Sequence, residues 1–115
     1  MAAVSRFVFG EVVLVPFPFT VQLGSKKRSA VVVSSSSYGA NRRDIVIMAI
    51  TSQVRQPLGF GEAMIAEWQG VGLIKVSVFK PVCTTIEQRF VIRTMGALAA
   101  ADVTELQGVL AAAIG

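Results

Sequence analysis

Three consecutive cations, Lys26, Lys27 and Arg28, stand directly before a valine-rich run that is typical of a buried strand. An arginine whose backbone is fixed where a strand begins can offer its planar guanidinium to a phosphate through two hydrogen bonds, and neighbouring lysines add more loosely placed charges. A charge run is more commonly a solvated face, so a plain basic turn is the alternative. The triplet alone therefore indicates a phosphate site without separating it from a solubilising turn.

A second polar group follows another apolar run, which ends in Thr51, Ser52 and Gln53. Hydroxyl and amide groups at a strand end suit phosphate oxygens and ribose hydroxyls, although such hydroxyls also bond to their own backbone in turns. If the two runs pair as a hairpin, Arg28 and Thr51 emerge at the same end of the sheet and can share a ligand. Together the two groups predict a phosphate cradle at a sheet edge.

The overall charge agrees with an anionic partner. Arg55 and Lys80 add cations around the same predicted rim, and the chain has a net charge of +4 and a pI near 9.9. A basic surface favours polyanions such as nucleic acid or an anionic membrane. Composition alone does not choose between these two.

The absence of histidine from the 115 residues is the most informative negative observation. It excludes the usual zinc clusters, a Ser-His-Asp triad and a two-histidine ribonuclease mechanism. Cys83 is the only cysteine, which excludes a disulfide within the chain and is compatible with a reducing cytoplasm. We expect Cys83 to be a small buried hydrophobe and not a nucleophile, because no neighbour would lower its pKa.

The N-terminal apolar stretch "FVFGEVVLVPFPF" follows Arg6 but is interrupted by Glu11 and two prolines, so we interpret it as a strand and not as a secretion signal. No run approaches the 18 to 20 or so apolar residues of a membrane span. Alternating or continuous apolar patterns bounded by turn residues predict short strands elsewhere. The predicted strands are Glu11 to Val15, Ser29 to Ser34, Asp44 to Ile50, Glu62 to Ala66, Leu73 to Phe79 and Phe90 to Arg93.

The chain ends in "AADVTELQGVLAAAIG", where Val103, Leu106 and Leu110 recur at helical spacing, with Asp102 near the start and Gly115 at the end. Strands of this length with one terminal helix predict a mostly β fold, a small and strongly bent barrel, in a single domain spanning residues 1–115. Hydrophobic residues make up 53% of the chain and charged residues only 16%. We therefore expect part of the surface to be buried against a second copy.

Three segments, "FGEVVLVPFPFT", "KKRSAVVVSSSSYGANRRDIVIMAITSQ" and "IRTMGAL", occur in an order and spacing that resembles the MazF/PemK (Kid) toxins of type II toxin–antitoxin pairs. The resemblance runs from about Phe9 to the C-terminus. It implies a CcdB/PemK-like, SH3-like barrel paired as a homodimer. It also implies metal-independent, cofactor-free, sequence-specific cleavage of single-stranded messenger RNA in the cytoplasm, neutralised by a cognate antitoxin peptide. The substrate 2′-hydroxyl is then the nucleophile and leaves a cyclic phosphate and a free 5′-hydroxyl.

The resemblance also implies residue roles. Arg28 falls on the arginine that holds the scissile phosphate, Thr51 on the active-site threonine, and Glu11 on an acidic position that is either site-orienting or structural. The predicted RNA contacts are Lys26, Lys27, Ser52, Gln53, Arg55 and Lys80.

Two departures from the family pattern stand out. The proline that usually follows the arginine is Ser29, and "KPVCTTI" has Pro81 and Thr84 where some relatives carry an Asp and an Arg. The general acid and base are therefore not identified by the resemblance.

Two other functions stay open on the sequence. A CcdB-like gyrase poison would act through its terminal helix, but this helix is mostly Ala, Val and Leu. The second open function is that of a catalytically inactive RNA-binding member of the same fold. The aromatic side chains of Phe17, Phe19, Tyr38 and Trp68 could stack on bases, although core or interface packing is the commoner role in so small a barrel.

Overall fold

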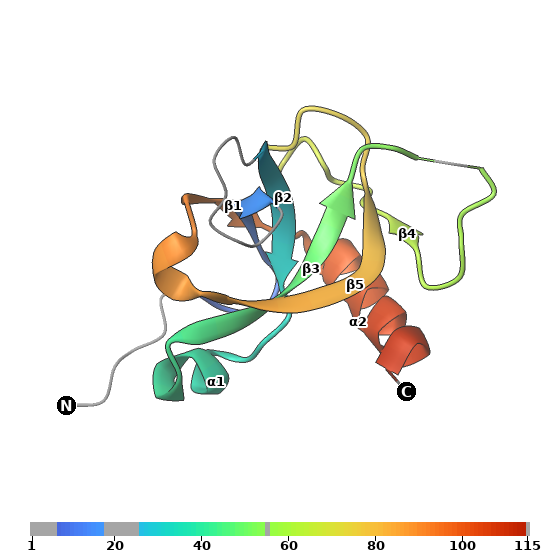
Figure 1. The fold of residues 1–115 in the computed structure, drawn as a ribbon. Helices are drawn as coiled ribbons and strands as arrows, with labels where there is room; N and C mark the ends of the chain where they lie inside the picture. Colours follow the sequence, from blue (N-terminus) through green and yellow to red (C-terminus); the bar gives the residue numbers. More distant parts are fainter. Residues whose placement is uncertain (1–6, 18–25, 55, 115) are drawn as a thin grey trace.

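One curled sheet of six antiparallel strands, in the order β4-β5-β3-β2-β1-β6, forms the body of the protein (Figure 1). A computed structural model of the chain describes residues 7–17, 26–54 and 56–114. The strands are β1 (Glu11–Phe17), β2 (Lys26–Val32), β3 (Asp44–Thr51), β4 (Ala63–Met64), β5 (Val78–Glu87) and β6 (Arg93–Ala97). The helices are α1 (Ser36–Asn41), the short 3-10 helix η1 (Gln88–Phe90) and α2 (Ala100–Ile114).

The three central strands are apolar on both faces, as the valine-rich run predicts for β2. Successive side chains of a strand point to opposite faces, and the buried residues divide accordingly into two clusters. Val12, Val31 and Met48 belong to the cluster that also packs α2, whereas Val13 and Val32 belong to the other. Burial on both faces fixes the register of these strands, because a slip by one residue would exchange the two sets.

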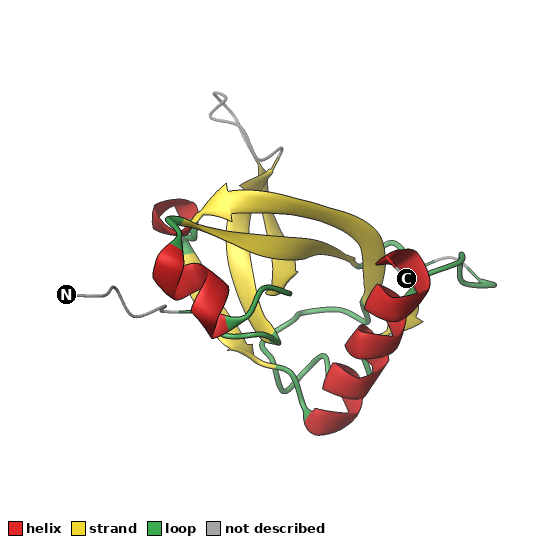
Figure 2. Ribbon diagram, turned by 90° about the horizontal axis from the view of Figure 1, so that it is seen from below, coloured by secondary structure: helices red, strands yellow, loops and turns green. Residues whose placement is uncertain are grey.

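A loop closes the barrel where the sheet stays open between β4 and β6. The backbone of residues 71–72 lies against β6, since a Cβ added to Gly96 would stand 3.2 Å from the Cα of Val71. Gly72 has a φ of 84°, a conformation that glycine adopts without strain. Figure 2 shows the strands curving around the interior, with α2 along one open side. The predicted mostly β, strongly bent fold with a terminal helix is confirmed.

Asp102 in the first turn of α2 ties this helix to the chain after β4. Its carboxylate is fully buried and accepts the backbone N–H groups of Ala66 and Glu67 at 2.7 and 2.9 Å. A negative charge in the first turn also complements the helix dipole. Leu106 and Val109 continue the buried face of α2. Within the described ranges, neither helix has the length and apolarity that crossing a bilayer requires.

Two turns of the same construction, Phe-Gly-Glu, precede β1 and β4. The Glu11 carboxylate accepts the N–H of Val8 at 2.6 Å, and the Glu62 carboxylate accepts that of Gly59 at 2.7 Å. In each turn the glycine before the glutamate has a positive φ, 91° at Gly10 and 80° at Gly61, as position three of a type II turn requires. Glu11 is therefore a turn-closing residue with a direct counterpart elsewhere in the chain.

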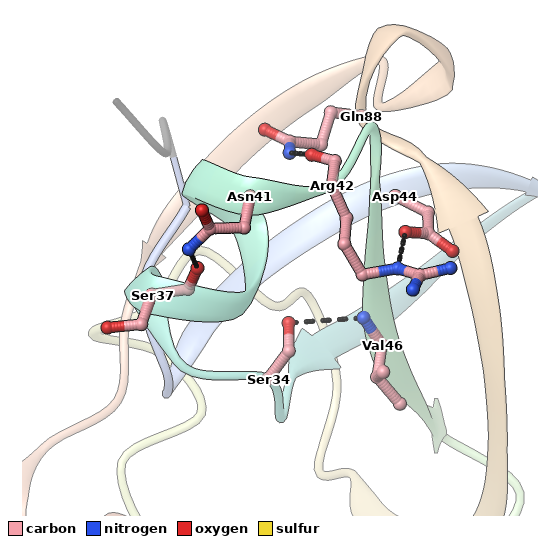
Figure 3. A network of polar contacts seen from close by, with 7 residues as sticks. All are labelled: Ser34, Ser37, Asn41, Arg42, Asp44, Val46 and Gln88. Carbon is pink, nitrogen blue, oxygen red and sulfur yellow. Dashed lines mark hydrogen bonds and ion pairs between the residues drawn. The ribbon is translucent and has the colours of Figure 1, made fainter. Parts of the chain in front are cut away.

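The segment after β2, which the serines and Gly39 predict to be a loop, contains the missed helix α1. Ser35 caps it by accepting the N–H of Tyr38 at 3.1 Å. Figure 3 shows how the end of α1 is held: Arg42 donates to Asp44 at 3.0 Å, and its carbonyl accepts from Gln88 at 3.1 Å. Asp44 raises the pKa of the Arg42 guanidinium, through this hydrogen bond first and its charge second. This polar network lies around the beginning of β3.

Two of the predicted strands are displaced. In the strand predicted from Leu73 to Phe79, only the last two residues belong to a strand, β5, because the preceding ones form the loop that closes the barrel. Ile74, predicted to face the core, is 91% exposed. The strand then continues to Glu87 through Pro81, which lies where the β3–β5 register shifts and where a missing N–H is tolerated. The last strand begins at Arg93, where the prediction ends, and the strand predicted from Glu62 to Ala66 is only two residues long.

The expectation that Cys83 is buried is wrong. It lies in the outward-facing part of β5 and is exposed. Trp68, by contrast, is half-buried and packs against the larger core cluster, so the core interpretation of this aromatic residue is confirmed.

Candidate functional site

The predicted hairpin brings Arg28 and Thr51 together. β2 and β3 pair antiparallel, with Ala30 opposite Ala49 as the last pair toward this end. Arg28 and Thr51 lie two residues beyond that pair on their strands, and both line the same two pockets. The start of β2 and the end of β3 therefore bring a guanidinium and a hydroxyl to one region of the surface.

A pocket of about 360 Å³ opens at this end of the sheet. We call it the main pocket. It combines an apolar floor with a cationic rim. Its lining residues are Leu14, Lys27, Arg28, Ser29, Ile50, Thr51, Ser52, Gly72, Leu73, Ile74, Lys75, Ser77, Arg93 and Met95.

A second pocket of about 180 Å³ adjoins the main pocket. It is lined by Arg28, Ser29, Ala49, Ile50, Thr51, Gln53 and Lys80. Arg28, Ser29, Ile50 and Thr51 line both. Residues of the β2–β3 end, Arg28 and Thr51 among them, are therefore common to both pockets.

The hydroxyl of Thr51 is oriented by its own turn. Its oxygen accepts the backbone N–H of Gln53 at 3.1 Å, which is the local turn bond that such residues commonly make. A hydroxyl that accepts one hydrogen bond keeps its proton for donation. Thr51 is therefore suited to donate to an oxygen of a bound ligand.

The charge of the main pocket has one sign. Its cations are Lys27, Arg28, Lys75 and Arg93. All seven Asp and Glu residues lie in the part of the chain that the structure describes, and none of them lines either pocket. Lys27, Lys75 and Arg93 form no ion pair within the described ranges. The pocket is therefore a focused positive region in which a phosphate is the fitting ligand.

The other predicted contacts are distributed unevenly. Lys27 and Ser52 line the main pocket, and Gln53 and Lys80 line the second. Lys26 is exposed at the first position of β2 and lines neither pocket. Arg55 lies outside the described residues.

Glu11 also lies apart from the pockets. It begins β1, whereas Arg28 pairs with Val15, four residues further along the strand. This separation is about 13 Å at the rise of a β-strand. This position fits a structural role for Glu11, and it does not fit a role in orienting groups of the site.

Sequence reasoning missed Lys75 and Arg93. Lys75 stands in the loop interpreted as a strand, and Arg93 begins β6 two strands away from β2. Their approach to the pocket depends on loop closure and strand order. The one available signal was Gly96 within a strand-like stretch, a position that often marks a bulge.

Within the described ranges, no group of three or more His, Cys, Asp or Glu residues lies together in a way that could hold a metal ion. Cys83 is exposed, yet desolvation raises the pKa of its thiol, so its thiolate is disfavoured. Neither observation adds a metal ligand or a nucleophile to the candidate site.

Comparison with known proteins gives one family. The model of the PemK-like, MazF-like toxin of type II toxin–antitoxin systems matches residues 9–114. No curated protein matches the chain.

Several solved structures share the fold. An endoribonuclease in complex with its cognate antitoxin from a mycobacterial species has a TM-score of 0.75 at 18% identity, covering 94% of both chains. Another mycobacterial endoribonuclease has a TM-score of 0.76 at 15% identity, covering 97% of this chain and 94% of the other. MazF with MazE from Deinococcus radiodurans has a TM-score of 0.72 at 22% identity, covering 94% and 95%. At these identities the likeness is one of fold.

Proposed function

Because the chain belongs to the family of PemK-like, MazF-like toxins of type II toxin–antitoxin systems, we propose that it is an endoribonuclease that cleaves single-stranded messenger RNA at a specific sequence, without a metal or cofactor. The observation that carries the proposal is that Arg28 and Thr51 both line two adjoining pockets, one of which is lined by four cations and no Asp or Glu. This arrangement supports binding of an RNA phosphate.

In the proposed reaction the ribose 2′-oxygen attacks the adjacent phosphorus while the bond to the 5′-oxygen breaks. The products are a 2′,3′-cyclic phosphate and a 5′-hydroxyl, with one proton lost from the 2′-oxygen and one gained by the 5′-oxygen. Arg28 offers donors to the non-bridging oxygens, whose charge changes most in the transition state, and Thr51 adds one hydrogen bond. Fixed donors of this kind commonly contribute about 100- to 1000-fold each in rate.

The test is incubation of the purified protein with a long single-stranded RNA in EDTA, followed by mapping of the cut ends. We expect discrete cuts with cyclic-phosphate ends, which Arg28→Ala and Thr51→Ala each reduce strongly. Arg43→Ala and Thr85→Ala are matched controls, because both side chains are exposed and line neither pocket. Uncut RNA with folded protein, or cleavage that requires added metal, contradicts the proposal.

We also propose a cytoplasmic homodimer that binds a cognate antitoxin peptide. Large apolar side chains are exposed on this protomer, including Phe60 at 85%, Ile74 at 91% and Val82 at 55%, and burial against a second copy would remove them from water. Light scattering of the purified protein should give the mass of two chains. A monomer at micromolar concentration would refute the dimer.

A further inference from the structure

A β-bulge in β6 decides which residue faces the main pocket from that strand. β1 pairs with β6 so that Val12 is opposite Gly96, but Val13 is opposite Thr94, which leaves Met95 as an extra residue. As a result Arg93 lies opposite Leu14. Without the extra residue, Thr94 would take that position. Bulges re-aim side chains in this manner next to functional sites.

The floor under Arg93 is continuous with the rest of the pocket. Leu14 is opposite Ser29 on its other side, so Ser29, Leu14 and Arg93 form one row across three strands. The Ser29 hydroxyl lies 3.5 Å from the Met95 sulfur, to which it donates. The side chain of the bulged residue thus crosses the floor, while Arg93 stands at its edge.

Lys75 supplies a second cation on this side. It stands in the closing loop, where Leu73 is buried and Ile74 and Lys75 are exposed. Arg93 is also exposed, and both residues line the main pocket. β2 and β6 are separated by one strand, which places their backbones about 10 Å apart. Arg93 therefore stands on a strand apart from Arg28 and Lys27, and Lys75 belongs to the loop whose Gly72 lies against Met95 of the same strand as Arg93.

We propose that Arg93 and Lys75 bind a phosphate of the RNA backbone next to the scissile one, and so set the register of the strand in the pocket. This rests on the proposed function, since the scissile phosphate is the one assigned to Arg28. The nucleotide between the two phosphates lies over Leu14 and Met95, whose apolar surface suits a base or ribose face. Arg93 is a positioning residue in this arrangement, and the bulge at Met95 places it opposite Leu14.

The test uses the full chain and an RNA oligonucleotide centred on a mapped cut, with a 2′-O-methyl group at the reacting ribose so that it binds without being cleaved. Each phosphate in turn is replaced by an uncharged methylphosphonate, and affinity is measured by fluorescence anisotropy. We expect one flanking position at which the replacement weakens wild-type binding about tenfold, the size of one lost charged hydrogen bond. Arg93→Ala, which keeps Lys75, should be less sensitive than the wild type at that position and equally sensitive at the scissile phosphate, and Arg93→Ala combined with Lys75→Ala should be insensitive at that position.

Salt dependence gives an independent readout. For single strands, each lost phosphate contact makes the slope of log K against log salt less negative by about 0.7. Arg93→Ala should show this loss, Arg93→Lys should restore the slope, and the exposed control Arg43→Ala should leave it unchanged. Wild-type sensitivity of Arg93→Ala at every position, together with an unchanged slope, would overturn the inference.

The two proposals fail differently. If the long RNA stays uncut, the nuclease proposal is refuted, and the slope is then measured with an unmodified mixed-sequence 12-mer. If the RNA is cut but Arg93→Ala binds and cuts like the wild type, only the second phosphate site is refuted.

Discussion

Replacing Asp102 should cost more stability than any other single polar change in the described part of the chain. Its carboxylate accepts two backbone N–H groups at 2.7 and 2.9 Å and is fully buried. A hydrogen bond to a charged group contributes about 1.5–3 kcal/mol. Because the donors Ala66 and Glu67 belong to exposed residues, water can partly replace the lost acceptor. Two such bonds together amount to about 3–6 kcal/mol, and we therefore expect the lower end of this sum, about 3 kcal/mol, for Asp102→Ala.

The assay is urea unfolding followed by the fluorescence of Trp68, the only tryptophan, which packs against the core cluster that contains Leu106. At a urea dependence of about 1–3 kcal/mol per molar, the midpoint of Asp102→Ala should fall by roughly 1–3 M at equal protein concentration. Asp102→Asn keeps one acceptor and should fall between this variant and the wild type. Glu105→Gln, exposed on the same helix, should change little. A loss below about 1 kcal/mol for Asp102→Ala would refute the reasoning, since the two N–H groups would then be satisfied by solvent.

Two further predictions concern residues outside the pockets. Glu11→Ala should lower the free energy of unfolding by about 1 kcal/mol, because it removes the hydrogen bond that the carboxylate accepts from the N–H of Val8, and it should leave kcat/KM for RNA unchanged. Glu62→Ala is the matched control. A marked loss of kcat/KM in Glu11→Ala alone would show that Glu11 belongs to the active site. Cys83 should react with iodoacetamide at a higher pH midpoint in the native protein than in denaturant, since desolvation raises the pKa of its thiol. The sign for stability follows: there is no effect below the ordinary thiol pKa, and stability falls as pH rises through it. A native midpoint below the denatured one would contradict this.

The parts of the fold that the sequence predicts correctly are those whose burial pattern is local. β1, β3 and α2 carry apolar residues at the period of their own element, and their positions agree with the prediction within two or three residues. The stretch around Ile74 has the same alternation but belongs to a loop. The alternation there is compatible with a strand, but it contains no information on the backbone turn at Gly72, which brings the chain against β6.

The residues of the candidate site likewise include some that local pattern predicts and some that it does not. Arg28 and Thr51 stand near the start of one strand and at the end of the next, and these two consecutive strands pair antiparallel, so the pairing is enough to bring them to the same end of the sheet. Arg93 reaches the pocket only because β6 pairs with β1 and carries one extra residue at Met95. Sequence separation from Arg28 is large, and neither strand order nor a bulge leaves a periodic signal. The contribution of Arg93 to the pocket could therefore not be predicted from the sequence pattern.

The distribution of the carboxylates explains how a modest net charge of +4 produces a strongly cationic pocket. Glu11 and Glu62 close turns, Asp102 anchors α2, and Asp44 pairs with Arg42. None of these four groups lines either pocket, so the four cations of the main pocket have no carboxylate among its lining residues. Structural use of the acidic residues thus sets the electrostatics of the site. In a chain without histidine, catalysis that depends on fixed positive charge and positioning requires this separation, because a carboxylate in the pocket would compete with the phosphate for the same guanidinium groups.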